Sequence, residues 1–485
     1  MYLVEFDGDQ TVFGFQDLGT RFQFPKSFDQ KQTRQFRIIR YQYFHIFPFF
    51  RTALSAHPDT APFARFCYTL HFNTICLKRP HVHILLCDAV FTGETLLLDH
   101  GIVFDQTILS VQPNETLRAL YGAQCEEMGK GSLILPGLVN PHVHLEFSSN
   151  QTTLAYGGFL PWLHSVIAHR DDLINGCDEG CMQQAVRMML DNGITAFGAV
   201  SSYGFDLEAC AKAPQKVVYF NELIGSDPAM ADPLYANFQE RLFASQAICR
   251  EGFHPSVAIH SPYAVHRVLI HKALAYARAH RLRVTAHFME SPAEREWLDR
   301  SEGEFKPFFE TFLRQSRPAN APLEFLECFE GLPTLFTHAV QANDDELTLL
   351  REGGHTLIHC PISNRLLGNG ALNLTRLDHK GVRWVCGTDG LSSNYTLDLF
   401  EEMKAALFMH HEQDLLPLAH QLWHSVTKGA AEALGLNCGT IAENYDADLL
   451  VARIDYEMNE QLLLHLLLRR PAIESVYVQG NKVKG

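Results

Sequence analysis

The segment PGLVNPHVH, residues 136–144, is the first of eight short apolar runs that each end at or near a polar residue. Amphipathic stretches separate the runs, such as CMQQAVRMMLDNG at 181–193, with apolar positions three and four residues apart. Strands that alternate with helices predict a parallel sheet, and eight units favour a closed (β/α)8 TIM barrel over an open sheet. We therefore expect an α/β fold with the barrel at residues 138–436. The other seven runs are ITAFGAV (194–200), KVVYFNEL (216–223), SVAIH (256–260), RVTAH (283–287), TLFTH (334–338), HTLIHC (355–360) and VRWVCGTD (382–389).

Short strand patterns flank this segment on both sides. HVHILLCDAVFTG at 81–93 opens a series of strands with turn residues between them, and SVYVQGNKVKG at 475–485 closes a similar series at the other chain end. We expect residues 79–137 and 437–485 to build one small β-sandwich together.

Residues 1–78 differ from the rest of the chain. They hold 14 of the 34 Phe and show neither a helical period nor a sustained alternation. Two interpretations remain open: an accessory segment that packs or binds something, or an upstream extension outside the working enzyme. We favour the unassigned extension, because a regular strand pattern begins only at Pro80.

Charge and composition exclude several classes of protein. With 40 Lys plus Arg against 55 Asp plus Glu, the formal charge of −15 offers no basic surface for a nucleic acid. No run reaches the roughly 18 apolar residues of a membrane span, and the first residues lack the pattern of a secretory signal. We expect a cytoplasmic protein with no membrane or nucleic-acid partner. A homodimer is the default expectation for its assembly.

Four residues at strand ends point to a metal. In a strand, alternation places His142 and His144 on the same inward face, where both imidazoles reach one ion. His287 ends the fifth run and Asp389 the eighth. Three histidines and one carboxylate suit a catalytic divalent ion with an open position for water. Each residue taken alone is more often a core or loop group, so the prediction rests on their joint placement.

Two further residues suit proton chemistry at this centre. Glu290 follows His287 in HFME, where its carboxylate could face the attacking water and shuttle a proton. His338 ends the sixth run and could hydrogen-bond the same water. The fourth run ends in His260 rather than in a lysine that would bridge two metals. A mononuclear centre is therefore expected.

The motifs together resemble the amidohydrolase superfamily, in its chlorohydrolase and adenosine-type deaminase branch. Within that branch, the segment HVHLEFSSNQTTLAYGGFLPWLHSVIAHRDDL at 142–173 looks like the aminofutalosine deaminases of menaquinone biosynthesis. The resemblance covers about residues 80–485. The motifs that carry it are PGLVNPHVH, HSPY at 260–263, HFME at 287–290, His338, HCPISNRLLGNG at 359–370 and GTDG at 387–390.

This resemblance implies a role for each matching residue. It implies that Glu290 passes a proton to a purine ring nitrogen, that His338 orients the attacking water and that His260 contacts the substrate. Asp389 would accept the water proton. The implied ion is Zn2+, with Fe2+ as the alternative, because a set of three His and one Asp suits either. The implied metal ligands are His142, His144, His287 and Asp389.

One position departs from the related methylthioadenosine and S-adenosylhomocysteine deaminases, which carry a Glu for the ribose in W-L-x-E. Here Trp162 and Leu163 lead to Ser165. Aminofutalosine carries a benzoate, which needs a cation, and Arg170 and Arg365 are the candidates. For each Arg the alternative is a pair with a neighbouring acidic group. Trp162 either lines the substrate pocket or belongs to the core.

The resemblance thus implies a metal-dependent hydrolytic deaminase of an adenine nucleoside, converting 6-amino-6-deoxyfutalosine to futalosine and ammonia. The alternative substrates are methylthioadenosine, S-adenosylhomocysteine, guanine and triazines. A barrel without catalysis that serves as a scaffold is the alternative of a different class. The complete set of metal and proton-handling residues argues against it.

Overall fold

The computed structural model describes residues 2–7, 10–15, 20–23 and 82–485. The chain forms two compact units, Met1–Arg79 and Pro80–Gly485. The described part of the first unit is an antiparallel sheet of β1 (Tyr2–Asp7), β2 (Gln10–Phe15) and β3 (Thr20–Gln23). Most of the predicted extension at 1–78 lies outside the described residues.

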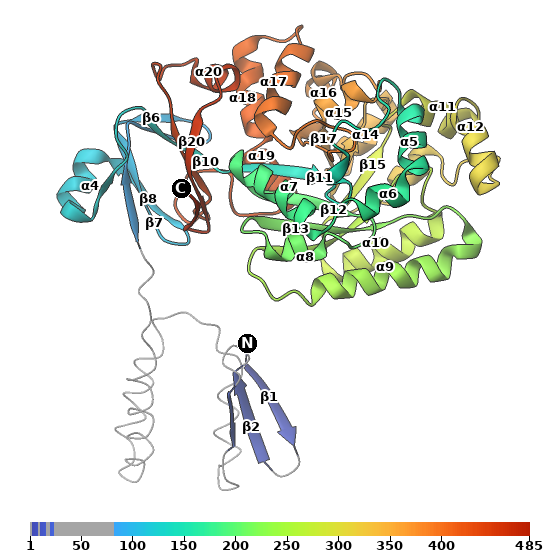
Figure 1. The fold of residues 1–485 in the computed structure, drawn as a ribbon, viewed down its shortest axis with the longest axis horizontal. Coiled ribbons are helices and arrows are strands. Elements are labelled where there is room, and N and C mark those ends of the chain that lie inside the picture. The colour runs from blue at the N-terminus through green and yellow to red at the C-terminus, as the bar shows by residue number, and fades with distance from the viewer. Residues whose placement is uncertain (1, 8–9, 16–19, 24–81) are drawn as a thin grey trace. The chain divides into compact units, whose positions relative to one another are not determined.

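Eight parallel strands of the second unit form the barrel, and they follow one another in chain order (Figure 1). Their residues are almost all buried, as expected for strands covered by helices on one side and by a packed interior on the other. At the seam between the first and last strands, the Asp389 N–H donates to the His142 carbonyl oxygen at 3.1 Å. The predicted barrel is confirmed. The strands are β11 (Leu138–Val143), β12 (Ile194–Ser201), β13 (Lys216–Leu223), β14 (Phe253–Ile259), β15 (Val284–Phe288), β16 (Thr334–His338), β17 (Thr356–His359) and β18 (Arg383–Cys386).

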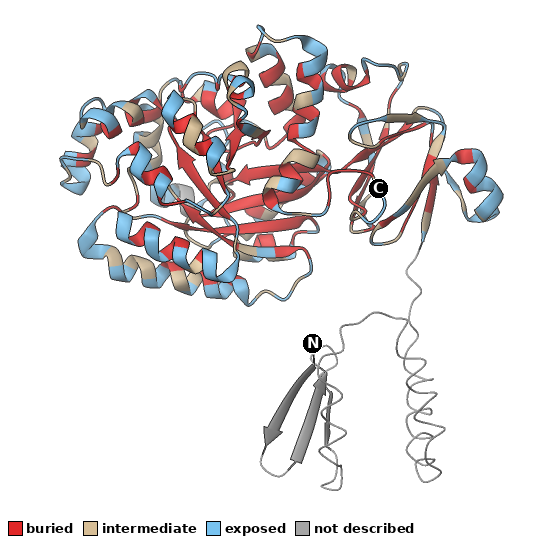
Figure 2. Cartoon of the chain, turned by 180° about the vertical axis from the view of Figure 1, so that it is seen from behind, coloured by how far each residue is buried: buried red, intermediate tan, exposed pale blue. Residues whose placement is uncertain are grey.

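Amphipathic helices cover the outside of the barrel, with buried faces toward the strands and exposed faces toward solvent (Figure 2). In α10, the buried Leu269, Ile270, Ala273, Leu274 and Ala277 recur at the helical period. The helices of this unit are α4 (Asn114–Tyr121), α5 (Phe159–Ala168), α6 (Arg170–Asn175), α7 (Glu179–Asp191), α8 (Leu207–Lys212), α9 (Ala231–Gln246), α10 (Arg267–His280), α11 (Pro292–Arg300), α12 (Phe305–Phe308), α13 (Pro322–Glu327), α14 (Asp344–Glu352), α15 (Pro361–Leu366), α16 (Leu374–Lys380), α17 (Leu399–Met409), α18 (Leu415–Ser425), α19 (Lys428–Leu434) and α20 (Leu462–Leu468).

Two smaller sheets combine segments from before and after the barrel. The six-stranded sheet has the order β21-β20-β19-β10-β5-β6, and β10 joins the two segments because it pairs with both β19 and β5. Apolar side chains of both sheets, including Leu85, Phe104 and Val451, share one buried cluster. The sandwich part of the predicted fold is confirmed. The strands of the two sheets are β4 (His83–Leu86), β5 (Ala89–Phe91), β6 (Leu96–Leu98), β7 (His100–Phe104), β8 (Ile108–Pro113), β9 (Glu126–Glu127), β10 (Ser132–Pro136), β19 (Leu449–Arg453), β20 (Ala472–Val478) and β21 (Asn481–Lys484).

Among the described helices, none combines the length and the apolar character needed to cross a membrane.

Candidate active site

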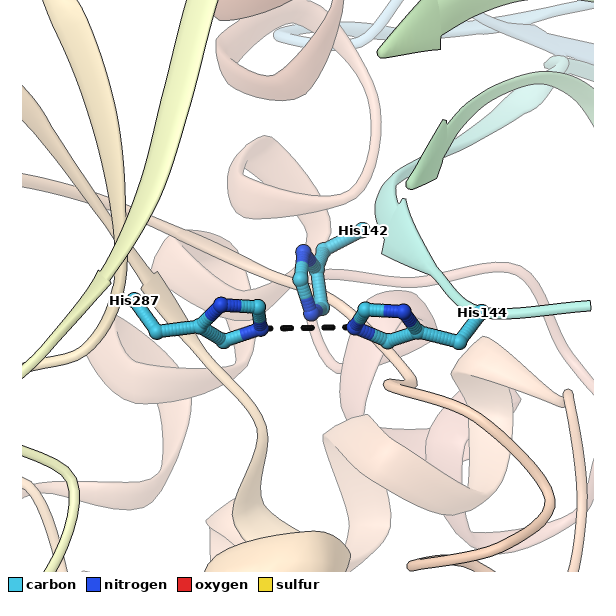
Figure 3. A group of neighbouring side chains, drawn as sticks. All are labelled: His142, His144 and His287. Atoms are coloured by element: carbon cyan, nitrogen blue, oxygen red, sulfur yellow. Dashed lines mark hydrogen bonds between the residues drawn. The ribbon is translucent and has the colours of Figure 1, made fainter. Parts of the chain in front are cut away.

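The carboxyl ends of the barrel strands bring the predicted metal ligands together. Figure 3 shows the imidazoles of His142, His144 and His287 turned toward one another. The Nε2 atoms of His144 and His287 lie 3.3 Å apart. The Asp389 Oδ1 atom lies 3.7 Å from His142 Nε2 and 3.8 Å from His144 Nε2. Residues that are up to 247 positions apart in the chain therefore face one point at the mouth of the barrel.

These side chains fit a divalent cation. The Nε2 atom of His142 is buried and has no hydrogen-bond partner in the described part of the chain. Burial lowers the pKa of His144 to about 4 and that of His287 well below its ordinary value, so both imidazoles are neutral near pH 7. Neutral imidazole and carboxylate are the ligands that Zn2+ and Fe2+ take. An ion shared by these side chains would supply the partner that the buried His142 Nε2 atom lacks.

Contacts behind three of the four side chains hold their orientation. The Nδ1 atom of His287 lies 2.9 Å from the His260 carbonyl oxygen, and that of His142 lies 3.3 Å from Thr337 Oγ1. Ser363 Oγ donates to Asp389 Oδ2 at 2.8 Å. With these contacts made, the Nε2 atoms of His142 and His287 face the centre, as does the Asp389 Oδ1 atom, which also accepts a hydrogen bond from the Gly390 N–H at 2.8 Å. Such outer contacts are typical of metal sites, where they set the direction of each ligand.

The backbone around the centre is strained. His338 has a φ of 76°, Asp389 of 59° and Met289 of 50°, all in the left-handed region that residues with a Cβ atom rarely adopt. Each lies at, or within three residues of, the end of a barrel strand. Strain of this kind concentrates at functional sites, where the surrounding structure compensates for it.

Glu290 and His338 lie beside the candidate metal site. The His338 Nε2 atom is 3.6 Å from Glu290 Oε1 and 4.0 Å from Asp389 Oδ2. Burial and the negative charge of Asp389 raise the pKa of Glu290 well above its ordinary value. A carboxyl group that stays protonated near pH 7 can act as a general acid. Burial lowers the pKa of His338 to about 4, so its imidazole is neutral.

His260 contacts a residue that sequence reasoning missed. Glu222 on β13 is fully buried, and its Oε1 atom lies 2.8 Å from His260 Nδ1. Burial alone would raise the pKa of Glu222, but His260 lowers it far below its ordinary value. Glu222 therefore holds the His260 ring as a carboxylate. The available signal was a glutamate near the end of the strand pattern KVVYFNEL.

The other three residues predicted to bind the substrate lie around the mouth of the barrel but do not form one cluster. They are Trp162, Arg170 and Arg365. Trp162 on α5 is half-buried, and its Nε1–H donates to the Ser392 carbonyl oxygen at 2.9 Å. Arg170 at the start of α6 is exposed and lies 5.1 Å from the centroid of the Tyr203 ring. Arg365 on α15 is also exposed. Within the described residues, neither arginine forms an ion pair.

Comparison with known proteins agrees with this geometry. The model of the amidohydrolase family matches residues 133–483. The chain belongs to the amidohydrolase family. The predicted family and the predicted class of hydrolytic enzyme acting on C–N bonds are thereby confirmed. Members of this family depend on a metal ion.

Several relatives cover most of the chain. It is 46% identical over 396 residues to the aminodeoxyfutalosine deaminase of Nitratiruptor sp., a match that spans 81% of this chain and 97% of the relative. It is 32% identical over 397 residues to the adenosine deaminase of Helicobacter pylori, across 80% of this chain and 95% of that protein. The solved structure of Helicobacter pylori aminofutalosine deaminase with methylthio-coformycin superimposes with a TM-score of 0.79 at 30% identity, covering 83% of this chain and 100% of that one.

Proposed function

We propose that this amidohydrolase deaminates 6-amino-6-deoxyfutalosine to futalosine and ammonia. The observation that carries the proposal is the 46% identity to an aminodeoxyfutalosine deaminase over 97% of its length. The side chains of His142, His144, His287 and Asp389 around one point support it, because hydrolytic deamination needs an activated water.

The four side chains would hold one divalent ion, for which we propose Zn2+, with Fe2+ as the alternative. When bound, the ion supplies the Lewis acidity that makes water nucleophilic near neutral pH. The chain itself handles the protons. His338 Nε2 accepts a hydrogen bond from the attacking water, and Asp389 accepts the proton that this water loses. His338 is neutral and Asp389 is ionised, as these two roles require.

Glu290 acts on the adenine ring. As a buried carboxyl group with a raised pKa, it donates a proton to N1, which makes C6 electrophilic toward water. The Asn369 side-chain amide donates to Glu290 Oε1 at 3.1 Å and holds the group in place. The proton that Asp389 takes up then goes to the amino group, and ammonia leaves from C6. As the C6 carbonyl forms, the proton of the new hydroxyl group returns to Glu290, which restores the carboxyl group.

His260 and one of the two arginines, Arg170 or Arg365, are the candidates for binding the ribose and the benzoate of the substrate. We propose that His260, held by Glu222, contacts the ribose. Ser165 is a poor replacement for the glutamate of the W-L-x-E relatives, because its hydroxyl already donates to the Trp162 carbonyl oxygen at 2.7 Å and accepts from the Ala155 N–H at 3.1 Å. For the benzoate we favour Arg170 over Arg365.

Arg170 has flat apolar neighbours that suit an aryl carboxylate. Its guanidinium lies over the Tyr203 ring, and Tyr203 stacks on Phe205 with centroids 5.6 Å apart. Phe147, three residues after His144, meets the same Tyr203 ring edge-on at 6.2 Å. The arrangement combines a cation without an ion-pair partner and stacked rings, which are the two features that a benzoate needs.

A substrate panel tests the proposal. Purified, zinc-loaded enzyme is assayed for ammonia release from aminofutalosine, methylthioadenosine, S-adenosylhomocysteine, adenosine and guanine. We expect the highest kcat/KM for aminofutalosine. Turnover of adenosine analogues without turnover of aminofutalosine would reject this substrate and keep the deaminase chemistry.

A further inference from the structure

A line of buried polar side chains leads from His338 away from the reacting atoms. His338 Nδ1 lies 2.9 Å from Asn364 Oδ1, and Asn364 Nδ2 lies 3.5 Å from His359 Nδ1. His359 Nε2 then lies 3.1 Å from His410 Nε2. All four side chains belong to residues that are at most 2% exposed. They come from β16, α15, the end of β17 and the residue that follows α17.

The hydrogen bonds of this line have one consistent direction. Because Asn364 presents its oxygen to His338, the His338 proton is on Nδ1. Because Asn364 donates through its nitrogen to His359 Nδ1, the His359 proton is on Nε2 and is donated to His410. The His410 proton is then on Nδ1. That atom faces Glu412 Oε1 at 3.8 Å.

The surface carboxylate selects this direction over the reverse. If every hydrogen bond ran the other way, His410 Nδ1 would carry a lone pair toward the Glu412 carboxylate, which is an unfavourable contact. Burial lowers the pKa of His359 well below its ordinary value and also lowers the pKa of His410. Both imidazoles are therefore neutral, as a directed line of single donors and acceptors requires.

We propose that Asn364, His359 and His410 are positioning residues that hold His338 in its Nδ1–H tautomer. In this tautomer the Nε2 lone pair faces Glu290 and Asp389, where it can accept a hydrogen bond from the attacking water. The line orients His338 and does not conduct protons, because the Asn364 amide has no proton that titrates in water. The inference deepens the proposed deaminase function and rests on it for its kinetic consequence.

Three variants separate this role from a merely structural one. His410→Leu removes the acceptor for the His359 proton, whereas His410→Gln offers an amide oxygen in its place. His355→Leu is the matched control, since His355 is also buried, directly precedes β17 at the end opposite to His359 and accepts a hydrogen bond from the Thr334 N–H at 3.1 Å.

The expected result is a loss in kcat alone. His410→Leu should lower kcat about tenfold with KM unchanged, and His410→Gln should recover it to within about threefold of the parent enzyme. His355→Leu should lower Tm and leave kcat unchanged. The proposal is overturned if His410→Gln is as slow as His410→Leu, if His410→Leu keeps full kcat, or if the loss falls in KM.

A second measurement needs neither a folded variant of His410 nor a substrate. In zinc-loaded enzyme labelled with 15N-histidine, long-range proton–nitrogen spectra identify which ring nitrogen of His338 carries the proton. The signals are assigned by comparison with His338→Gln. A proton on Nδ1 supports the proposal, and a proton on Nε2 overturns it. Since this readout is independent of turnover, it stays decisive even if the enzyme proves inactive on aminofutalosine.

Discussion

Both ends of the barrel bury charged or ionisable side chains, but the two ends differ in the partners that these side chains have. At the amino end, Lys216 Nζ lies 2.6 Å from Asp446 Oδ2 and 2.7 Å from Asp448 Oδ2, which joins β13 to the segment before β19. At the carboxyl end, His142 Nε2 is buried with no hydrogen-bond partner in the described structure, and the Glu290 carboxyl is buried beside Asp389.

The difference separates a structural cluster from a catalytic one. Burial lowers the pKa of Lys216, but Asp448 and Asp446 more than compensate and raise it, so the ammonium group is stabilised in place. At the other end, burial and like charges shift the pKa values of His144, His287 and Glu290 in directions that cost stability, which is typical of functional sites. Substitutions at the amino end should therefore change the free energy of unfolding, and substitutions at the carboxyl end should change kcat.

Metal removal should give the largest effect and should act on the carboxyl end alone. Without an ion to bring the pKa of water from 15.7 to about 7, activity should fall below detection. Dialysis against a chelator, followed by Zn2+ addition, measures the loss and the recovery. The far-ultraviolet circular dichroism spectrum should stay unchanged. Full activity in metal-free protein would contradict the proposed centre.

Glu290→Gln should reduce kcat by about 10²- to 10⁴-fold, because Gln cannot donate the proton that a general acid supplies. Metal content, measured by elemental analysis, should stay at the parent value. The exposed Glu296→Gln on α11 is the control and should change neither quantity. Loss of metal from Glu290→Gln would make Glu290 a ligand instead.

Lys216→Met should remove the buried ion pairs at the amino end of the barrel. It leaves the Asp446 and Asp448 carboxylates without their buried cation and should lower the free energy of unfolding by about 3–5 kcal/mol. The kcat of the folded fraction should be unchanged. The control is Lys212→Met, because Lys212 makes two comparable ion pairs on the surface and its loss should hardly alter denaturation. An equal loss in the free energy of unfolding from the two variants would contradict the distinction between the buried ion pairs of Lys216 and the surface ion pairs of Lys212.

Acid should test the buried His355, which lies at the amino end. Burial lowers its pKa from 6.5 to about 4, so the unfolded chain takes up a proton first as the pH falls. The contribution of neutral His355 to the free energy of unfolding is fully present above pH 6.5. As the pH falls toward 4, the free energy of unfolding decreases by about 3 kcal/mol. Urea denaturation across this range should show a shallower pH dependence for His355→Gln than for the parent protein. Identical slopes would contradict the assignment.

Arg170→Met should give the smallest effect. If Arg170 binds the substrate carboxylate at an exposed position, KM for aminofutalosine should rise about tenfold with little change in kcat, and KM for substrates without a carboxylate should not change. Arg365→Met is the matched control and should leave both constants near the parent values. The reverse pattern would transfer the role to Arg365.

The barrel and the candidate metal ligands could be predicted from local patterns. Eight apolar runs separated by amphipathic stretches predicted the strands, and strand alternation placed His142 and His144 on one face. Parallel strands in a barrel end at the same face, so His287 and Asp389 at strand ends had to lie near them. The spacing of residue types along the chain carries this information by itself.

The partners behind these side chains were decided only by the tertiary structure. Glu222 meets His260 across 38 residues, and His359 meets His410 across 51. Such contacts depend on strand register and on the depth at which each helix packs, which no short-range pattern records. The sequence by itself identified the residues that we propose to bind a metal and move a proton. The fold decided which tautomer, charge and direction each of them has, because burial and hydrogen bonding set these properties.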